Sequence, residues 1–471
     1  MRKIAYLLLC YVIFLPIMQL HAQDTIVTDH VIIGNIFISG NKNTREKLIL
    51  RELTFTTGDT LSSLHIDNAF QRSRENLLNL SLFNYVVIEK IAVRNKIDIY
   101  VIVEERWYLW PSSFFDHADR NVSTLIHDKS WSKVDYGFGM KKNNFRGRGE
   151  DLNFLVTFGY NEKFAFSYSN IYLDRKRIHS ISPSVSFLRN DAVDYVIKDN
   201  RVQSYKDPNG QIFESLKLSL GYFYRKYLYE KHTVYLDFKQ NYVKDTVLSL
   251  NADFFGKNAQ YLSLLYLTYI YSHDKRDRKY YPLKGTMLNV ELRKYGFGFD
   301  NENGIDVLYV KSIYNKHWTM SDRWFFASGN SFVKTIYGRY PFFLGRGLGY
   351  GNKFIRGYEY YVIDGNDYYM SKNTLKYALL PTQITTIHFL PFSKFNKIHY
   401  AFYLNLSVDI GYVNAGDKLY KVRNNYMVNT LLYSASIGLD FVSYYDYVLS
   451  VAFAVNRYKE SGIFLHINAP I

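Results

Sequence analysis

The sequence is poor in cysteine and proline and has no long apolar run beyond its amino-terminal segment. It contains 1 cysteine and 9 prolines among 471 residues. The cysteine, Cys10, lies inside that first run, so neither a disulfide nor a thiol site is expected in the rest of the chain. No later stretch approaches the roughly 20 consecutive apolar residues that a transmembrane helix needs, so the sequence predicts none.

Motifs of the common enzyme families are also missing. The chain has no G-x-S-x-G, H-E-x-x-H, paired C-x-x-C or Walker sequence. The glycine-rich run GRGLGYG at 345–351 is not followed by a helical pattern, so we interpret it as a flexible loop rather than a phosphate-binding turn. The 12 histidines show no metal-ligand spacing. The sequence therefore predicts no enzyme, no cofactor and no metal site.

The apolar segment at the start has the pattern of a secretory signal. MRKIAYLLLCYVIFLPIMQLHAQ begins with two cations, continues with an apolar run from Ile4 to about Leu20, and has the small residue Ala22 before Gln23. We predict a signal peptide over residues 1–22, cleaved after Ala22. Lipid attachment through Cys10 is disfavoured because that cysteine lies too early in the run.

Aromatic residues are abundant. The chain has 45 tyrosines and 34 phenylalanines, and aromatic residues make up 18% of it. The aromatic girdles of a transmembrane β-barrel would use this excess, although a large soluble β protein is an alternative that composition leaves open. The net charge of +15 suits anionic partners, but we expect no nucleic acid among them.

Residues 27–106 have a mixed α/β pattern. VIIGNIFISG is typical of a strand, and NKNTREKLILREL predicts a short helix with Thr44 at its N-cap. In a second helix Ile66, Phe70, Ser73 and Leu77 share one face. FNYVVIEKIAV and KIDIYVIVEERWYL then indicate a pair of strands. The β-α-α-β-β order, with GNKNT after the first strand, resembles a POTRA domain.

From about residue 107 onward, apolar residues recur at every second position. Segments of about ten residues with apolar and polar faces are the signature of a transmembrane barrel. The predicted fold is mainly β, a 16-stranded antiparallel transmembrane β-barrel over 107–471 preceded by the small α/β domain. The long outer connections are expected at 191–214, 244–258, 338–370 and 415–430. The predicted strands start near 108, 133, 151, 163, 179, 215, 232, 259, 285, 307, 323, 371, 399, 431, 446 and 462.

Four short motifs extend the resemblance to the whole chain. NNFRGRGEDL, HDKRDRKYYPLKGTML, FIRGYE and SVDIG occur in order at the expected strands. Together they resemble the BamA/TamA outer-membrane assembly and translocation superfamily, which includes the two-partner secretion transporters. The resemblance implies a place in the bacterial outer membrane, with the POTRA domain in the periplasm. It also implies that the long sixth loop, 338–370, folds back into the barrel.

In that family the arginine of the sixth loop meets an aspartate of strand thirteen. The matching residues here are Arg356, followed by Gly357 and Tyr358, and Asp409, followed by Gly411. The sequence also places Asp409 on the inward face of its strand, where small neighbours leave room for a loop. We predict that Arg356 binds Asp409 and latches the loop inside the barrel.

Two alternatives to this latch remain open. Asp440 also lies on an inward face, so it is the second candidate partner for Arg356. In the other alternative, the arginine is a solvated loop residue and Asp409 is hydrated in the lumen.

The first and last strands both contain or adjoin a proline, which has no amide to donate. Pro111 lies in the first strand, and Pro470 near the end of FLHINAPI, where the family commonly has a terminal aromatic residue. We predict a weak seam between these strands, and a crosslink between Phe115 and Leu465, or between their register neighbours, would span it. The alternative is that both prolines lie beyond the paired region.

These patterns predict a factor that assembles, inserts or translocates other proteins. The client, an unfolded outer-membrane or secreted protein, would pair with an edge of the small domain, either KIDIYVIVE or VIIGNIFI. Outer-membrane lipid and accessory lipoproteins are further expected partners. Alternatives are a two-partner-type secretion pore and a passive channel. Basic clusters at 174–179 and 273–279 are interpreted as solvated turns, with lipid head groups or partners as the alternative.

Overall fold

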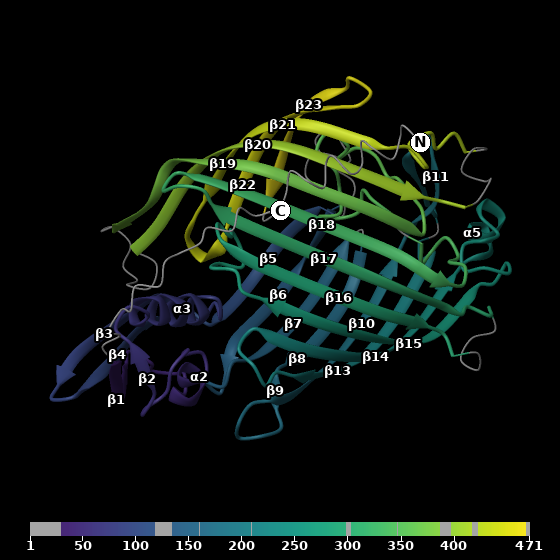
Figure 1. The fold of residues 1–471 in the computed structure, drawn as a ribbon. Helices are drawn as coiled ribbons and strands as arrows, with labels where there is room; N and C mark the ends of the chain where they lie inside the picture. The colour runs from purple at the N-terminus through teal and green to yellow at the C-terminus, as the bar shows by residue number, and fades with distance from the viewer. Residues whose placement is uncertain are drawn as a thin grey trace, which may run out of the picture.

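The computed structural model describes residues 30–117, 134–159, 161–208, 210–297, 303–345, 347–386, 397–416 and 423–467. Within these residues a small α/β domain is followed by a closed barrel, and the domain lies at one end of the barrel (Figure 1). No helix in these ranges is long and apolar enough to cross a membrane. The predicted signal peptide lies outside the described residues.

The small domain packs its helices on one face of a four-stranded sheet. Helix α3 turns Ile66, Phe70, Ser73 and Leu77 into the core, as the spacing of these residues predicts. The buried cluster combines this face with inward residues of the sheet, such as Ile99. The elements are β1 (His30–Ser39), α2 (Glu46–Leu50), β2 (Thr60–Ser62), α3 (Ile66–Leu78), β3 (Phe83–Val93) and β4 (Lys96–Glu105).

The strand order of this sheet corrects the predicted edges. The order is β2-β1-β4-β3, with β1 and β4 parallel. β4, which is KIDIYVIVE and its neighbours, is therefore central, since β1 and β3 hydrogen-bond to its two sides. β1 is also internal, but its partner β2 covers only His30 to Ile32. The full-length edge is β3. Sequence order does not reveal this arrangement because the parallel β1–β4 pairing joins segments far apart in the chain.

The barrel closes with β23 beside β5. β8 and β9 both pair with β10 and are separated by Asn170 alone, so they count as one strand and the described part of the barrel has sixteen strands. Each strand begins within four residues of its predicted start. They are β5 (Leu109–His117), β6 (Val134–Phe145), β7 (Glu150–Gly159), β8 (Asn161–Ser169) with β9 (Ile171–Tyr172), β10 (His179–Asn190), β13 (Phe213–Tyr224), β14 (Glu230–Val243), β15 (Tyr261–Asp274), β16 (Gly285–Tyr295), β17 (Val307–Thr319), β18 (Trp324–Tyr337), β19 (Asp367–Thr386), β20 (Lys397–Asn414), β21 (Leu432–Val442), β22 (Val448–Asn456) and β23 (Ser461–Ile467).

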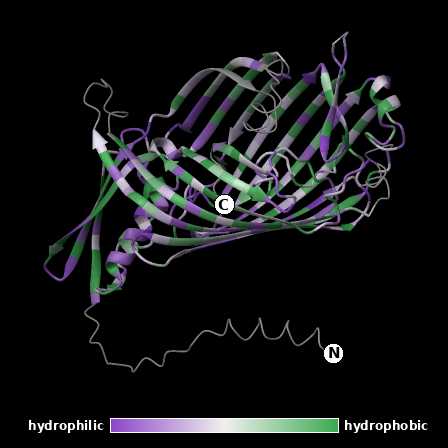
Figure 2. Ribbon diagram, turned by 90° about the horizontal axis from the view of Figure 1, so that it is seen from above, coloured by the Kyte–Doolittle hydropathy of each residue, from purple (hydrophilic) through white to green (hydrophobic). Residues whose placement is uncertain are grey.

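Burial alternates along the strands. In β20 Leu406, Val408 and Ile410 are exposed on the outside, whereas Ser407 and Asp409 are buried on the inside. Figure 2 shows the same alternation as hydrophobic and hydrophilic residues along the barrel strands. A closed sheet with an apolar outer surface leaves no unpaired edge in lipid, which is the requirement for crossing a membrane with strands.

The outer connections form a layer of their own. The connection after β10 contains a hairpin, β11 (Ala192–Lys198) and β12 (Arg201–Lys206), and the connection after β14 contains α5 (Asp245–Leu250). Phe254 and Phe255 pack here against Phe343 from the start of the sixth loop. The tip of the hairpin reaches inward, where Asn200 O accepts a hydrogen bond from Val362 N at 2.8 Å. The sequence patterns did not predict this hairpin or helix.

Candidate functional site

The sixth loop connects β18 to β19, and its residues 347–366 lie inside the barrel. Its apolar side chains pack against the inner wall. The cluster of buried residues comprises Leu348, Ile355, Tyr358, Tyr361 and Ile363 of the loop with Tyr368, Met370, Val413, Ala415, Met427, Val428 and Leu432. The loop is therefore held by a hydrophobic core of its own and not only by polar contacts.

Arg356 and Asp409 meet in this position. Arg356 Nη2 donates to Asp409 Oδ1 at 2.6 Å and Nε donates to Oδ2 at 2.8 Å, which is a two-point contact of guanidinium and carboxylate. The backbone amide of Arg356 also donates to Asp409 Oδ2, at 3.1 Å. The remaining guanidinium nitrogen, Nη1, donates to Ser407 and Thr374. Asp409 is fully buried, so each charge depends on the other for compensation.

Gly411 makes room for the loop at this point of the wall. A Cβ on Gly411 would lie 2.1 Å from Ile355 Cδ1 and 3.1 Å from Cγ1. Ile355 precedes the arginine and is itself buried, so a side chain at position 411 would push the loop away from β20. The small inward residue is thus required by the close approach of Ile355.

The residues after the arginine attach the loop to the last strands of the barrel. Gly357 has a φ of +85°, a conformation that glycine adopts at little cost, and its carbonyl accepts a hydrogen bond from Asn456 Nδ2 at 3.0 Å. Tyr358 is 1% exposed. Its hydroxyl donates to Tyr433 O and accepts from Arg457 N, both at 3.2 Å.

Two contacts that the sequence analysis missed join the loop to β23. Glu359, which is fully buried, accepts from Gly357 N at 2.7 Å and lies 3.2 Å from His466 Nε2. Phe354 stacks on the same imidazole with ring centroids 4.8 Å apart. The sequence could have indicated His466, because it is a polar residue at an inward-facing position of the strand segment IFLHI. The sixth loop therefore contacts the strand that closes the barrel.

Asp440, the second candidate partner of Arg356, binds another residue. Its Oδ2 accepts a hydrogen bond from the Tyr281 hydroxyl at 2.8 Å. Tyr281 belongs to the inner turn after β15, and burial together with the charge of Asp440 raises the pKa of Tyr281 well above its usual range. Asp440 is opposite Tyr403 of β20, three inward positions from Asp409. The alternative that Arg356 binds Asp440 is therefore wrong, because Asp409 accepts from both Nε and Nη2 of the guanidinium.

The predicted seam residues lie in β5 and β23. Pro111 is inside β5, opposite Met140 of β6, and Phe115 is opposite Tyr136. Leu465 in β23 is opposite Val451 of β22. Pro470 lies outside the described residues. β5 and β23 are neighbours in the closed barrel, so Phe115 and Leu465 are on adjacent strands. Opening between these strands stays a prediction.

The small domain is fixed to the barrel around the carboxylate of Glu105. That carboxylate accepts from Asn43 N at 3.0 Å and Thr44 N at 2.6 Å. Asn144 Nδ2, at the end of β6 before the β6–β7 turn, donates to Thr44 Oγ1 at 2.8 Å. Gly147 in this turn approaches so closely that a Cβ would lie 2.0 Å from Asn43 O. Two motifs of the sequence, GNKNT and NNFRGRG, thus form one junction.

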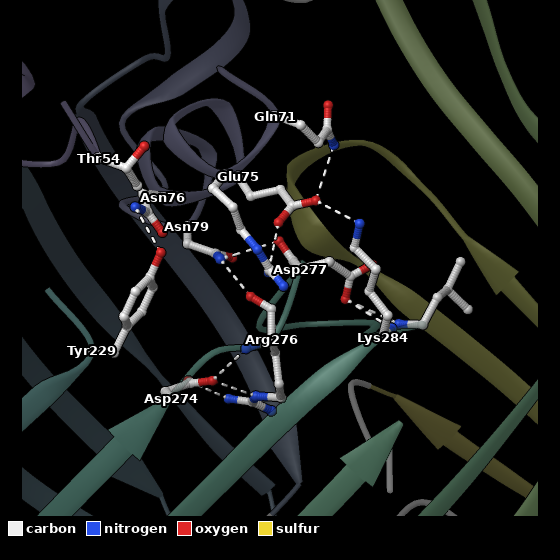
Figure 3. Close-up of polar contacts among 12 residues, drawn as sticks. Thr54, Gln71, Glu75, Asn76, Asn79, Tyr229, Asp274, Arg276, Asp277 and Lys284 are labelled. Atoms are coloured by element: carbon white, nitrogen blue, oxygen red, sulfur yellow. Dashed lines mark hydrogen bonds and ion pairs between the residues drawn. The ribbon is translucent and has the colours of Figure 1, made fainter. Parts of the chain in front are cut away.

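A second row of polar contacts joins α3 to the inner turns (Figure 3). Asn79 Nδ2 donates to the carbonyls of Arg276 and Asp277 at 3.2 and 3.1 Å. Glu75 lies 3.3 Å from Lys284 Nζ. The basic turn at 273–279 is thus partly engaged with the small domain.

Two further ion pairs tie the domain to the rim. Glu52 accepts two hydrogen bonds from Arg225, at 2.7 and 2.8 Å, and Arg106 Nη1 lies 2.6 Å from Asp446 Oδ2. Multiple contacts on opposite sides hold the small domain across the inner mouth.

A polar cavity of about 590 Å³ lies between the small domain and this mouth. It is lined by residues of α2 and α3 and by the inner turns, among them Arg51, Arg177, Arg225 and Lys279. Among the residues that the structure describes, no group of three or more His, Cys, Asp or Glu side chains could hold a metal ion.

A family model of the POTRA domain, described as a surface antigen variable number repeat, matches residues 31–106. No curated protein matches the chain. Among solved structures, CdiB from Escherichia coli is 13% identical, with coverage of 93% of this chain and 76% of that one and a TM-score of 0.51. CdiB from Acinetobacter baumannii is 12% identical, with coverage of 93% and 73% and a TM-score of 0.50.

BamA from Haemophilus ducreyi lacking POTRA domains 1-3 is 16% identical, with coverage of 93% and 83% and a TM-score of 0.49. The likeness to the CdiB structures is one of fold, because the identities are low. Together with the POTRA match, it confirms the predicted class: one small α/β domain before a large antiparallel barrel.

Proposed function

We infer that this chain is a POTRA-plus-barrel protein of the bacterial outer membrane, with its POTRA domain in the periplasm, and we propose that it inserts or translocates other proteins. The domain order and fold resemble those of CdiB. The apolar outer surface of the barrel suits a membrane, and the POTRA domain lies at the end that carries the shorter turns. The chain would act by binding and guiding a client protein, without a chemical step.

The observation that carries the proposal is the filled lumen. A barrel of sixteen strands is wide enough for an aqueous channel. Here the sixth loop occupies the interior, anchored by Arg356 on Asp409. The POTRA domain lies across the inner mouth, through pairs such as Glu52 with Arg225. A protein built for free diffusion would not need either obstruction, whereas a protein that opens only for a client would use both.

The POTRA edge that suits a client is β3. β3 pairs with β4 on one side, and its distal half projects away from the barrel (Figure 1). Val87, Ile91 and Val93 are exposed on it. An extended client segment would add a strand here through main-chain hydrogen bonds, which demand little of its sequence. The exposed apolar side chains would cover alternate residues of that segment.

Insertion and secretion differ in the final location of the client protein. In the proposed experiment the purified protein is reconstituted into liposomes with its POTRA domain outward, and a urea-denatured eight-stranded outer-membrane protein is added. Insertion yields a folded, heat-modifiable client in the membrane, and secretion yields a protease-protected client in the lumen. Empty liposomes and liposomes with an unrelated porin are the controls. If the client folds or crosses at the same rate in all three, the proposed function is wrong.

The seam between β5 and β23 is tested by a disulfide. The single cysteine of the chain lies in the predicted signal peptide, so Phe115→Cys with Leu465→Cys reports cleanly, and register neighbours widen the search. The matched control is Phe453→Cys with Ile463→Cys, a cross-strand pair of β22 and β23 that locks a hairpin not expected to open.

If the seam works as a gate, oxidation of the first pair stops client processing, reductant restores it, and oxidation of the control pair has no effect. A locked seam that leaves insertion and secretion at the wild-type rate would show that lateral opening plays no part. Loss of insertion with retained secretion would assign the seam to insertion alone.

A further inference from the structure

The two longest of the described strands, β19 and β20, run past their neighbours at the inner end of the barrel. The pairing of β19 with β18 stops at Tyr377, and the pairing of β20 with β21 stops at Ala401. Beyond these points, among the described residues, the two strands pair only with each other, as a hairpin formed by residues 379–386 and 397–400. This inner hairpin projects beyond the rim on the side of the POTRA domain (Figure 1).

The inner hairpin has backbone edges that no other described strand covers. Near its base the pairing with β20 shifts register on both sides of Leu380, and Pro381 has no amide to donate, so this part of the β19 edge is blunted. Farther out, residues 383–386 pair regularly with 397–400. An open strand edge is a template for another extended chain. The hairpin therefore offers a short edge on each of its strands.

The inner hairpin lies beside the start of β3, the edge strand of the POTRA sheet. A cavity of about 90 Å³ is lined by Thr382, Ile384 and His399 of the hairpin and by residues 84–86 at the start of β3. A second cavity, of about 250 Å³, has Thr382 on one side and residues of α3 on another. Ile384 is 56% exposed. We call these two adjoining cavities the hairpin groove, and the POTRA domain and the hairpin are two of its walls.

Two arginines of the hairpin groove have no ion pair among the described residues. Arg74 of α3 and Arg278 of the inner turn after β15 line both cavities, and both are exposed. The one hydrogen bond of the Arg74 side chain in the described part of the chain is to a backbone carbonyl, from Nε to Val86 O at 3.0 Å. Both guanidinium groups are therefore available to a carboxylate from outside.

Three carboxylates line the hairpin groove, and all three are engaged. Glu75 pairs with Arg72 of its own helix, and Asp446 pairs with Arg106. Asp277 accepts hydrogen bonds from backbone amides of its own turn. The unpaired arginines therefore give the groove an excess of positive charge, which is complementary to an acidic occupant.

We propose that the inner hairpin and the POTRA domain together bind an extended, acidic segment of the client in the hairpin groove. This inference rests on the proposed function and adds a contact on the barrel to the one at β3. The main chain of the segment would hydrogen-bond to an open strand edge, which demands an extended conformation. Its carboxylates would reach Arg74 and Arg278. A segment held by both walls would connect the POTRA domain with the barrel.

Photocrosslinking of the full-length protein in a neutral detergent tests the proposal. A photoreactive residue is placed at Ile384, and the probes are biotinylated octapeptides in which valine alternates with glutamate or with lysine. The glutamate peptide should crosslink and the lysine peptide should not, because the arginines attract one and repel the other. The control position is Tyr227, which is 59% exposed and lies in the inner turn after β13, away from the groove.

Arg74→Gln and Arg278→Gln should each weaken the apparent affinity for the glutamate peptide roughly two- to fivefold, the range expected for exposed charge pairs. Arg175→Gln is the matched variant. It removes the same charge from an exposed position in another inner turn, next to β10 on the far side of the barrel, and should bind as the wild type does. The heat-modifiable gel shift of every variant checks that the barrel has folded.

Equal crosslinking of the two peptides at Ile384 would overturn the proposal, as would equal yields at Tyr227 and Ile384 or unchanged affinity in both groove variants. Crosslinks between two copies of the chain in place of the peptide would assign the hairpin to a contact between copies and also overturn it. The liposome experiment separates this inference from the proposed function. A wild type that processes the denatured client but does not crosslink the glutamate peptide refutes the groove alone, whereas crosslinking without client processing refutes the proposed function.

Discussion

Arg356 satisfies all three of its guanidinium nitrogens inside the barrel. Asp409 accepts from Nε and Nη2, and Ser407 accepts from Nη1. The side chain of Asp409 is 0% exposed and that of Arg356 is 14% exposed, so solvent screens the pair little. Removing one member of such a pair leaves a buried charge, which typically costs about 3–5 kcal/mol. The latch therefore depends on both residues.

Arg356→Gln should release the sixth loop without unfolding the barrel, because the strands keep their own hydrogen bonds. Hydrogen exchange of amides 354–363 should speed up by roughly 100-fold or more, the equivalent of about 3 kcal/mol. The control is Arg339→Gln in the same loop, whose pair with Asp253 is largely exposed and so contributes little. Amides that exchange at the wild-type rate in Arg356→Gln would show that the latch does not hold the loop.

Gly411→Ala tests the fit of the loop from the wall side. The new Cβ would overlap Ile355 Cδ1, and overpacking of this kind costs about 1–3 kcal/mol. Protease sensitivity of the loop should increase. Adding Ile355→Val removes the overlapping methyl group and should restore most of the resistance. A double variant as sensitive as Gly411→Ala alone would contradict this account of the close approach.

The sixth loop links β20 to the closing strand β23. Its arginine binds Asp409, and three residues later Glu359 contacts His466. An element attached at both places transmits displacement of the loop to the strand at the seam. At the inner end of the barrel, the junction with the POTRA domain is held in a similar way. Hydrogen bonds to Glu105 order the loop at 41–45, which contacts the barrel.

The POTRA junction should loosen in acid. Burial alone would raise the pKa of Glu105, but hydrogen bonds from Thr44 and Asn43 outweigh it and hold that pKa below its ordinary value of 4.5. A group with a lowered pKa stabilises the fold above its ordinary value, and this contribution is lost as the pH falls through the lower folded value. Exchange at the amides of Asn43 and Thr44, corrected for intrinsic rates, should accelerate below about pH 4.

Glu105→Gln provides the control for this pH dependence. Its neutral side chain cannot titrate, so exchange at the two amides should be faster at neutral pH and show no further acid step. An acid step of the same size in the variant would assign the effect to another carboxylate.

Strand β3 should contact the client. A photoreactive residue at Val87, Ile91 or Val93 is expected to crosslink to the denatured barrel protein used in the liposome experiment, because these positions border the open edge. Leu64, which is 60% exposed but lies before α3 and away from that edge, is the matched control position. Crosslinks at Leu64 as strong as those at β3 would indicate non-specific contact and argue against strand addition.

At the scale of the whole molecule, both ends of the barrel are covered. The outer hairpin touches the sixth loop through Asn200 and Val362, and the POTRA domain covers the inner mouth (Figure 1). We therefore expect small, flickering conductance for the wild type in planar bilayers. Arg356→Gln should increase both the size and the frequency of the openings. A large, steady conductance of the wild type would favour the passive channel instead.

The sequence alone determined the strands, their faces and the order of the two domains. A strand can be recognised from apolar residues at every second position and from the turns that flank it. Both signals are local in the sequence, so the starts of the sixteen barrel strands could be predicted within four residues. The contact between Arg356 and Asp409 could be predicted because the family resemblance links the distant motifs FIRGYE and SVDIG. The alternation of residues along the strand also placed Asp409 on its inward face.

Only the tertiary structure decided contacts between segments that share no local pattern. The order β2-β1-β4-β3 depends on a parallel pairing across the chain. The prediction of β4 as an edge was therefore wrong, whereas β1 is covered by β2 only from His30 to Ile32. Asp440 binds Tyr281 because an inner turn brings that hydroxyl into the lumen. Arg51 of the POTRA domain and Arg177 of the β9–β10 turn lie over the same Tyr172 ring only because the domain docks against the barrel. Periodicity determines which face a residue takes, whereas the closure of the barrel and the docking of the domain determine what that residue touches.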